Sequence, residues 1–213
     1  MTTPVIIANF KSHMNLQEAK DWIARISNPQ NKTVIVLPPF TLLDFFREQI
    51  EATKLNVFLG AQNISPFDEG AFTGEVNGKQ IREFCDFVLI GHSERRKNFT
   101  ESDEILTQKV ELALNDNLKP IFCIQDQETN IPQGVEIVAY EPIFAIGTGT
   151  PDTPQNAQKV SQAVKKNIPV FLYGGSIKGP NVASFTKTEG IDGVLVGGAS
   201  LDPQEFNQII QNA

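Results

Sequence analysis

Eight short apolar segments rich in β-branched residues constrain the fold of this chain most strongly. They lie at residues 5–9, 33–37, 57–61, 87–90, 120–124, 136–140, 170–173 and 193–196. None of them alternates cleanly between apolar and polar residues, which is typical of strands buried on both faces. Amphipathic segments with helical spacing lie between most of them, so we predict a parallel α/β protein.

The predicted helices differ in length and in the clarity of their start signals. We expect them at residues 15–26, 41–50, 77–84, 102–116, 153–167, 180–186 and 203–210. Ser102 caps one of the long helices, and Thr153 followed by Pro154 opens another. The apolar spacing places Leu16 on the apolar face of the first helix and Leu114 on that of residues 102–116.

Polar or glycine-rich residues gather where many different strands end. They are Asn9 and Lys11, Gln62 and Asn63, His92, Glu141, and residues 173–176 and 196–200. Functional residues drawn from the carboxyl ends of several strands are typical of an eightfold barrel. The alternation of strands and helices alone would fit an open, doubly wound sheet as well. No linker, repeat or low-complexity tract divides the chain, so residues 1–213 are expected to form one domain.

Composition narrows the classes of function. A chain of 213 residues with 40% hydrophobic content can form one substantial core. Its net charge of −7 argues against general binding of nucleic acid or of an anionic membrane surface, but leaves an anionic small ligand open. No apolar segment approaches membrane-spanning length, and Cys85 and Cys123 are too few for a disulfide framework. We expect a cytoplasmic protein.

Glu141 is the most informative single residue. It ends an apolar strand and is followed at once by Pro142, which favours an extended backbone at Glu141. A carboxylate at the edge of an apolar patch is costly to ionise and is a stronger base than one in water, so it is either paired or functional. For an isolated glutamate, a solvated or salt-bridged strand end would be the better interpretation, because charged residues are mostly exposed.

Seven fragments in chain order extend this interpretation. They are NFK (9–11), GAQN (60–63), GAFTGE (70–75), GHSERR (91–96), AYEPIFAIGTG (139–149), YGGS (173–176) and GVLVGGASL (193–201). Across essentially the whole chain, this set resembles the triosephosphate isomerase family. The resemblance implies a (β/α)8 TIM barrel that interconverts dihydroxyacetone phosphate and glyceraldehyde 3-phosphate, in glycolysis and gluconeogenesis, without a metal or cofactor. A different isomerase on the same barrel and a non-catalytic phosphosugar-binding barrel are the alternatives.

The resemblance also implies roles for individual residues. Glu141 is expected to be the base that moves a proton between adjacent carbons, through an enediolate. His92 is expected to donate a hydrogen bond to the substrate oxygens, and Lys11, assisted by Asn9, to stabilise the developing negative charge. Glu94 is expected to pair with Lys11 and hold it in place.

Recognition of the phosphate is expected at glycine-rich strand ends. The resemblance assigns it to Gly147, Ser176, Gly197 and Gly198, together with Asn9 and Lys11. Backbone N–H groups at such strand ends are suited to anions, especially after the seventh and eighth strands of a barrel. Any one of these glycines could instead serve only a tight turn.

The resemblance further assigns a lid and a dimer contact. The lid consists of Pro142, Ile143, Phe144, Ala145, Ile146, Gly147 and Thr148, with Tyr173 expected to hydrogen-bond it when closed. Phe144 stands where the family usually has tryptophan, and Pro151 fixes one backbone angle near the hinge. The loop at residues 68–75, with Phe72 and Thr73 at its tip, is expected to enter a pocket of a second subunit and form a homodimer.

One departure from the family is structural. Only residues 125–135 separate two predicted strands, where the family normally carries a loop and a full helix. Eleven residues reach about 36 Å, enough to run back along a strand of roughly 17 Å without a helix. We therefore predict a barrel without its fifth helix. Alternation turns Phe122, Ile124, Val138 and Tyr140 outward, so we also predict an uncovered apolar patch there.

Overall fold

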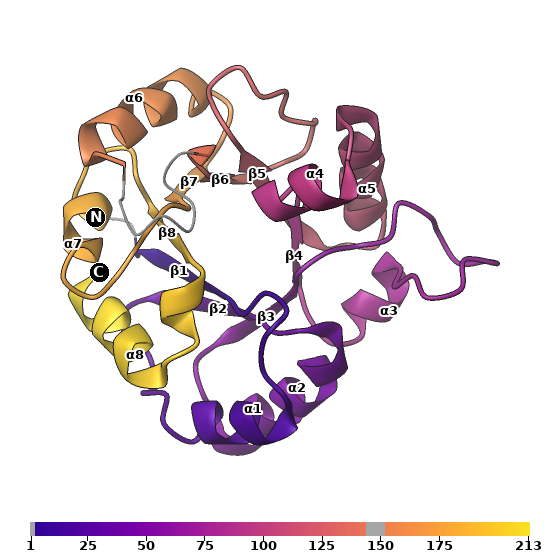
Figure 1. The fold of residues 1–213 in the computed structure, drawn as a ribbon, viewed down its shortest axis with the longest axis horizontal. Coiled ribbons are helices and arrows are strands. Elements are labelled where there is room, and N and C mark those ends of the chain that lie inside the picture. The colour runs from indigo at the N-terminus through magenta and orange to yellow at the C-terminus, as the bar shows by residue number, and fades with distance from the viewer. Residues whose placement is uncertain (1–2, 144–151) are drawn as a thin grey trace.

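The protein folds as a closed barrel of parallel strands. The computed structural model describes residues 3–143 and 152–213, and the eight strands among them pair in chain order around the barrel (Figure 1). They are β1 (Val5–Asn9), β2 (Thr33–Leu37), β3 (Phe58–Ala61), β4 (Phe87–Ile90), β5 (Lys119–Ile124), β6 (Ile137–Tyr140), β7 (Val170–Tyr173) and β8 (Gly193–Val196). Pairing of β8 with β1 closes the barrel, which confirms the barrel prediction and excludes the open, doubly wound sheet.

The strands are apolar on both faces. One buried cluster consists of residues that point into the barrel: Ile7, Ile35, Leu37, Phe87, Leu89, Ile121, Cys123, Ala139, Leu172 and Leu195. Their neighbours along each strand, such as Ile6 and Ala8 on β1, belong to a larger cluster beneath the helices. Burial on two sides explains why the strand segments show no alternation of apolar and polar residues. Gly193 has a special role here, because a Cβ at this position would collide with the carbonyl oxygen of Val5.

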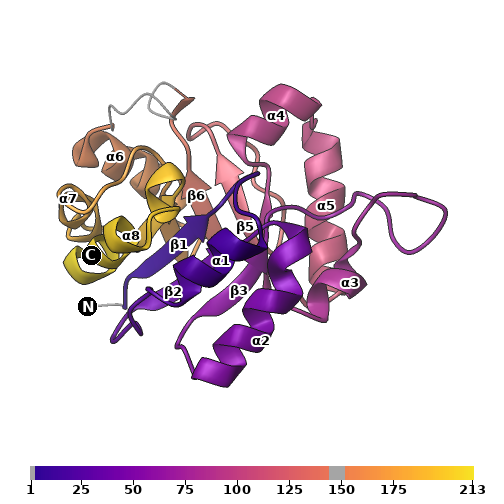
Figure 2. The same ribbon diagram turned by 60° about the horizontal axis from the view of Figure 1, so that its bottom comes forward.

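Helices surround the barrel (Figures 1 and 2). The described α-helices are α1 (Leu16–Ile23), α2 (Leu43–Thr53), α3 (Gly78–Arg82), α4 (Ser93–Phe99), α5 (Asp103–Asn115), α6 (Pro154–Val164), α7 (Val182–Thr186) and α8 (Pro203–Asn212). Two short 3-10 helices, η1 (Phe40–Leu42) and η3 (Gly198–Ser200), follow β2 and β8. Ser102 and Thr153 cap α5 and α6 as predicted, since each side chain accepts a backbone N–H of the first turn.

Two predicted helix faces were wrong in detail. Leu16 is 48% exposed, because α1 begins at this residue and packs through Ala19 and Trp22. Leu114 is likewise exposed, at the carboxyl end of α5, which packs through Leu106, Val110 and Ala113. In α5 the neighbouring Ala113 is buried instead, whereas in α1 both neighbours of Leu16 are exposed.

The link between β5 and β6 contains no helix, as predicted. In Figure 1 it passes as a salmon-coloured loop between α5 and α6. It nevertheless leaves the strands in full register, from Ile121 opposite Ile137 to Ile124 opposite Tyr140.

The predicted uncovered patch on these strands was wrong. The four outward-pointing residues, Phe122, Ile124, Val138 and Tyr140, are all buried and at most 4% exposed. Residues of the link itself cover these strands. Pro132 and Val135 are buried, and Ile131 packs against the larger cluster beneath the helices. Arg96 from α4 adds to this cover, with its guanidinium carbon 5.6 Å from the centre of the Phe122 ring.

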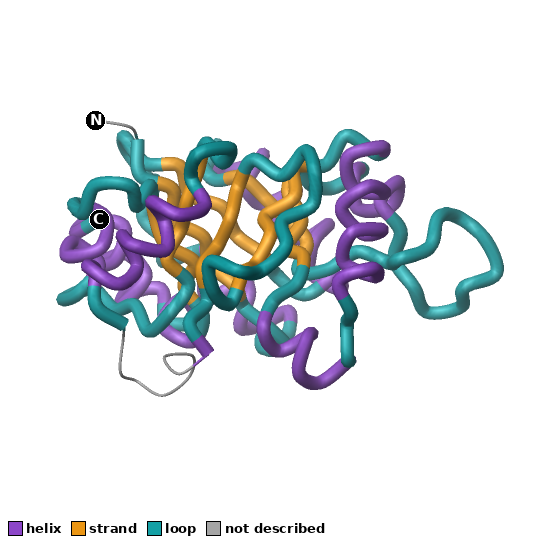
Figure 3. The backbone as a smooth tube through the Cα atoms, turned by 90° about the horizontal axis from the view of Figure 1, so that it is seen from above, coloured by secondary structure: helices purple, strands orange, loops and turns teal. Residues whose placement is uncertain are grey.

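The loop that precedes α3 extends away from the barrel (Figures 2 and 3). Within it, the rings of Phe67 and Phe72 are stacked with their centroids 4.2 Å apart. Phe72 is 41% exposed at the tip. Among the described residues, no helix is long and apolar enough to cross a membrane.

Candidate active site

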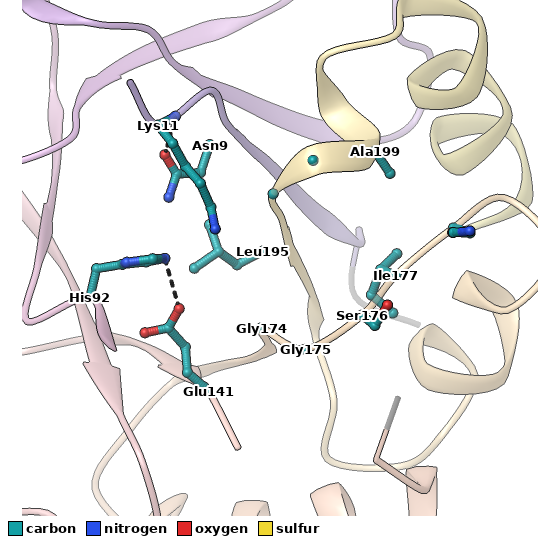
Figure 4. Close-up of a pocket in the computed structure, with 13 residues that line it drawn as sticks. Asn9, Lys11, His92, Glu141, Gly174, Gly175, Ser176, Ile177, Leu195 and Ala199 are labelled. Carbon is teal, nitrogen blue, oxygen red and sulfur yellow. Dashed lines mark hydrogen bonds and ion pairs between the residues drawn. The ribbon is translucent and has the colours of Figure 1, made fainter. Parts of the chain in front are cut away.

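A cavity of about 230 Å³ lies at the carboxyl ends of the strands. Its walls come from β1, β4, β6, β7 and β8 and the residues that follow them: Asn9, Lys11, His92, Glu141, Gly174–Lys178, Leu195 and Gly197–Ala199. Figure 4 shows His92 and Glu141 on one side and the glycine-rich segments on the other. The structure thus brings together most of the predicted site residues from distant parts of the sequence.

Glu141 is fixed at the end of β6. Its side chain is 2% exposed, and both carboxylate oxygens have donors. Oε1 lies 3.0 Å from Nε2 of His92, and Oε2 accepts the backbone N–H of Ser93 at 2.8 Å. Gly174 allows this arrangement, because a Cβ there would come within 3.0 Å of the Glu141 Cγ. The carboxylate is therefore oriented from two sides within an almost closed pocket.

The hydrogen bonds of His92 define the tautomer of its neutral ring. His92 is the N-cap of α4, and its Nδ1 accepts the backbone N–H of Glu94 at 3.2 Å. A nitrogen that accepts carries no proton, so the neutral ring has its proton on Nε2. This N–H points at Glu141, into the cavity (Figure 4). The imidazole can thus donate one hydrogen bond to a bound oxygen without carrying a charge.

Lys11 supplies the cation of the site. Its backbone has a φ of 53°, in the left-handed region, and its N–H donates to Oδ1 of Asn9 at 2.9 Å. Its Nζ lies 2.6 Å from Oε1 of Glu94. Burial of Glu94 opposes its ionisation, but the hydrogen bond and charge of Lys11 together outweigh this effect and hold the pKa of Glu94 below its usual value. The predicted pairing of Lys11 and Glu94 is therefore present.

The opposite wall offers backbone groups rather than side chains. Ser176 lies in the turn after β7, and Gly197 and Gly198 form the turn from β8 into η3. The Lys11 side chain packs closely against Gly197, and a Cβ at this position would lie 3.1 Å from the Lys11 Cε. Among the described residues, none accepts the N–H groups of Gly197 and Gly198. This wall is suited to an anion.

Part of the predicted lid falls outside the described residues. Pro142 is buried and Ile143 is 64% exposed. The other predicted lid residues, Phe144, Ala145, Ile146, Gly147 and Thr148, lie outside the described residues. The predicted contact of Gly147 with the phosphate therefore lies outside them as well. Tyr173 is buried, and its hydroxyl accepts the N–H of Asp152, directly beyond the undescribed residues, at 2.7 Å. Burial raises the pKa of Tyr173 to about 12, so its hydroxyl stays protonated.

The remaining predicted residues lie elsewhere. Phe72 and Thr73 belong to the loop before α3, and neither of them lines the cavity. Gln62 and Asn63 line an adjoining cavity of about 470 Å³ beside Lys11. Cys123 is buried on the inner face of β5, and burial, followed by the charge of Glu141, raises the pKa of its thiol. Among the described residues, no group of three or more histidine, cysteine or acidic side chains could hold a metal ion.

Sequence reasoning missed part of the lining. Leu195 resembles any other strand residue, although its alternation with Val194 and Val196 would have placed it inside the barrel. Ile177, Lys178 and Ala199 follow predicted phosphate residues directly and could have been inferred by extending those segments. The Ser93 N–H carries no sequence signal, because a backbone group is present at every position except proline.

Comparisons with known proteins agree with this geometry. The chain matches the family model described as triosephosphate isomerase over residues 4–213. It is 36% identical to the triosephosphate isomerase of Aquifex aeolicus, with 97% of this chain and 98% of the relative covered. Identity is 36% to that of Symbiobacterium thermophilum, covering 98% and 96%, and 35% to that of Mesomycoplasma hyopneumoniae, covering 98% and 99%. The Aquifex alignment spans 243 positions, more than the 213 residues here, so that relative has segments which this chain lacks.

Proposed function

Since the chain belongs to the triosephosphate isomerase family and interconverts dihydroxyacetone phosphate and glyceraldehyde 3-phosphate, we propose that Glu141, His92 and Lys11 carry out the proton transfer. The observation that supports these roles most strongly is the 3.0 Å contact between Nε2 of His92 and Oε1 of Glu141 in the cavity that Lys11 also lines. A base, a neutral hydrogen-bond donor and a cation thus meet at one place.

Glu141 acts first in the proposed reaction. One of its oxygens takes a proton from the carbon next to the substrate carbonyl, and the electron pair of the broken C–H bond forms the carbon–carbon double bond of an enediolate. The carbonyl electron pair moves onto its oxygen in this step. The same carboxylate oxygen then returns the proton to the adjacent carbon while the hydroxyl proton passes from one substrate oxygen to the other, so that no net proton is gained or lost. The Ser93 N–H orients the carboxylate from one side, since it donates to Oε2 at 2.8 Å.

His92 and Lys11 stabilise the charge that develops on oxygen. A substrate oxygen takes the place of Glu141 on the N–H of His92 Nε2, and the neutral ring polarises the carbonyl without a formal charge. The Lys11 ammonium lies beside the same space, held by Glu94 at 2.6 Å. Asn9 supports Lys11, because Oδ1 of Asn9 accepts the backbone N–H of Lys11. The phosphate binds at the opposite wall, at Ser176, Gly197 and Gly198.

Replacement of Lys11 by methionine tests these roles. The Lys11→Met variant should lose measurable turnover of glyceraldehyde 3-phosphate while its circular-dichroism spectrum stays unchanged, since the lysine is only partly buried. Lys20→Met, on the exposed side of α1, is the matched control and should retain full activity. Normal turnover by Lys11→Met would remove Lys11 from the mechanism.

We also propose that two copies of the chain form a homodimer through the 68–75 loop. The loop extends beyond its own barrel (Figure 2), and the adjoining cavity of about 470 Å³ is lined by Lys11, Glu94 and Phe99. Phe99 is 64% exposed there. A two-fold axis would let each loop enter the cavity of the other subunit.

Sedimentation velocity tests the dimer. The unmodified chain should sediment as a dimer at micromolar concentration, and Phe72→Asp should sediment as a monomer. Phe58→Asp alters a similarly exposed phenylalanine at the start of β3 and should leave the dimer intact. A monomeric unmodified chain with full activity would contradict the proposal.

A further inference from the structure

We propose that Asn181 is a positioning residue that sets the orientation of the phosphate-binding backbone after β7. This inference rests on the proposed phosphate site at Ser176. Asn181 precedes α7 and does not line the cavity. It acts through the turn at residues 174–178, and this turn lines the cavity.

The side-chain amide of Asn181 hydrogen-bonds to two backbone groups of that turn. Its Nδ2 donates to the carbonyl oxygen of Ser176 at 3.0 Å, and its Oδ1 accepts the backbone N–H of Lys178 at 2.8 Å. Both partners belong to residues that line the cavity. Among the described residues, no other group bonds to either of these two backbone atoms.

The direction of these hydrogen bonds determines which groups face a ligand. In a trans peptide the carbonyl and the N–H point in opposite directions within one plane. Because the Ser176 carbonyl points to Asn181, the N–H of Ile177 in the same peptide points away from Asn181. Ile177 lines the cavity, and no described residue accepts its N–H. Without Asn181 this peptide could rotate and turn a carbonyl dipole toward a phosphate dianion, which is unfavourable.

Asn181 is itself held firmly enough to orient the turn. Its N–H donates to the carbonyl of Lys178 at 3.1 Å, and its own carbonyl accepts the Ser184 hydroxyl at 2.6 Å. Helix α8 fixes the adjoining Gly179, whose N–H donates to Glu205 and whose carbonyl accepts from Asn212, both at 2.8 Å. The outer side of the turn is therefore anchored by α8, and its two cavity-lining peptides by Asn181.

The test compares ligands with and without phosphate in Asn181→Ala. Hydrogen bonds to charged groups are worth roughly ten- to a hundredfold in affinity. We expect the Kd for 2-phosphoglycolate and for inorganic phosphate, and the KM for glyceraldehyde 3-phosphate, to rise about tenfold or more. Isomerisation of D-glyceraldehyde, which has no phosphate and can be followed by NMR, should keep its kcat/KM.

Two further variants sharpen the comparison. Asn207→Ala is the matched control, because the Asn207 amide makes the same pair of bonds, to the N–H of Ser27 and the carbonyl of Arg25, both at 2.9 Å. It should leave all four quantities unchanged. Asn181→Asp keeps an acceptor for Lys178 but loses the donor to Ser176, so it should weaken phosphate ligands even if Asn181→Ala does not fold.

The outcomes separate this proposal from the proposed function. Unchanged phosphate affinity in a folded Asn181 variant, or an equal loss of activity toward glyceraldehyde, would overturn the positioning role. Inactivity of the unmodified chain toward both substrates would instead contradict the proposed mechanism. In that case the Kd values for phosphate and 2-phosphoglycolate would still decide the role of Asn181.

Discussion

Glu94 illustrates how a residue outside the chemistry supports it. Its carboxylate lies between two site residues, with Oε1 2.6 Å from the Lys11 ammonium and its backbone N–H on Nδ1 of His92. One residue thus fixes the position of the cation and the tautomer of the imidazole. The side chain of Glu94 holds Lys11, and its backbone N–H fixes the His92 tautomer. Substitution of Glu94 therefore affects mainly the position of Lys11.

The depressed pKa of Glu94 predicts a pH dependence of stability. Because the pKa is lower in the folded chain, the pair with Lys11 stabilises the fold above the ordinary carboxyl pKa of 4.5, and this contribution is lost as pH falls through the folded value. Glu94→Gln should therefore be less stable than the unmodified chain at pH 7, and the difference should shrink as pH falls below 4.5 and vanish once pH lies below the folded pKa of Glu94. Chemical unfolding across this pH range measures it.

A second background controls for other effects of the substitution. In Lys11→Met the partner of Glu94 is absent, so adding Glu94→Gln should give no such pH-dependent difference. A difference that persisted unchanged at acid pH, or one that survived in the Lys11→Met background, would show that the pair does not cause it.

At the scale of elements, the link between β5 and β6 shows how a loop replaces a helix. The sequence indicated the absence of the helix, because Asn130, Pro132 and Gly134 are poor helix formers. It did not reveal that the link would cover the strands, since burial depends on where individual loop side chains point. Pro132 and Val135 turn inward, and Arg96 arrives from an element that no local pattern connects to Phe122.

Removal of this cover should destabilise the barrel measurably. Val135 is 5% exposed, and Val135→Ala removes two buried methyl groups. We therefore expect the free energy of unfolding to fall by about 2 kcal/mol. Gln133→Ala, two residues earlier and exposed, should change it by less than about 0.5 kcal/mol. Urea denaturation of the two variants gives the comparison. Equal effects would mean that the link does not form part of the core.

The strand and helix predictions differ in accuracy for a physical reason. Strands buried on both faces have apolar runs bounded by polar residues, so β1, β2, β4, β7 and β8 match the predicted segments at both ends. Helices have only a narrow buried stripe, so one residue can make the difference between burial and exposure. Leu16 is exposed because it is the first residue of α1, and Leu114 is exposed while its neighbour Ala113 is buried.

At the scale of the whole molecule, barrel closure assembles the site. Asn9 ends the first strand, Lys11 follows it and Glu141 follows the sixth. They line one cavity, because parallel strands direct their carboxyl ends to the same rim. The sequence could indicate which residues belong there through their resemblance to a family. It could not give the contacts that orient them, such as the Ser93 N–H on Glu141 or the amide of Asn181.

The shortened link need not compromise this assembly. The pairing of β5 with β6 is complete up to Tyr140, and the N–H of Glu141 continues it by donating to the carbonyl of Ile124 at 2.8 Å. Glu141, the proposed base, is therefore anchored by the same strand pair that lacks an outer helix. A barrel with one connection reduced to a covered loop keeps the geometry on which proton transfer depends.

The most direct test of this account is turnover of glyceraldehyde 3-phosphate in a coupled assay, measured for the unmodified chain and for Glu141→Asp. The account predicts robust turnover by the unmodified chain. It predicts a fall in kcat of about a hundredfold in the variant, because the shorter side chain withdraws the carboxylate by about 1 Å. Absence of turnover while 2-phosphoglycolate still binds would identify a non-catalytic phosphosugar-binding barrel. Full kcat in Glu141→Asp, with chemistry rate-limiting, would show that Glu141 is not the base.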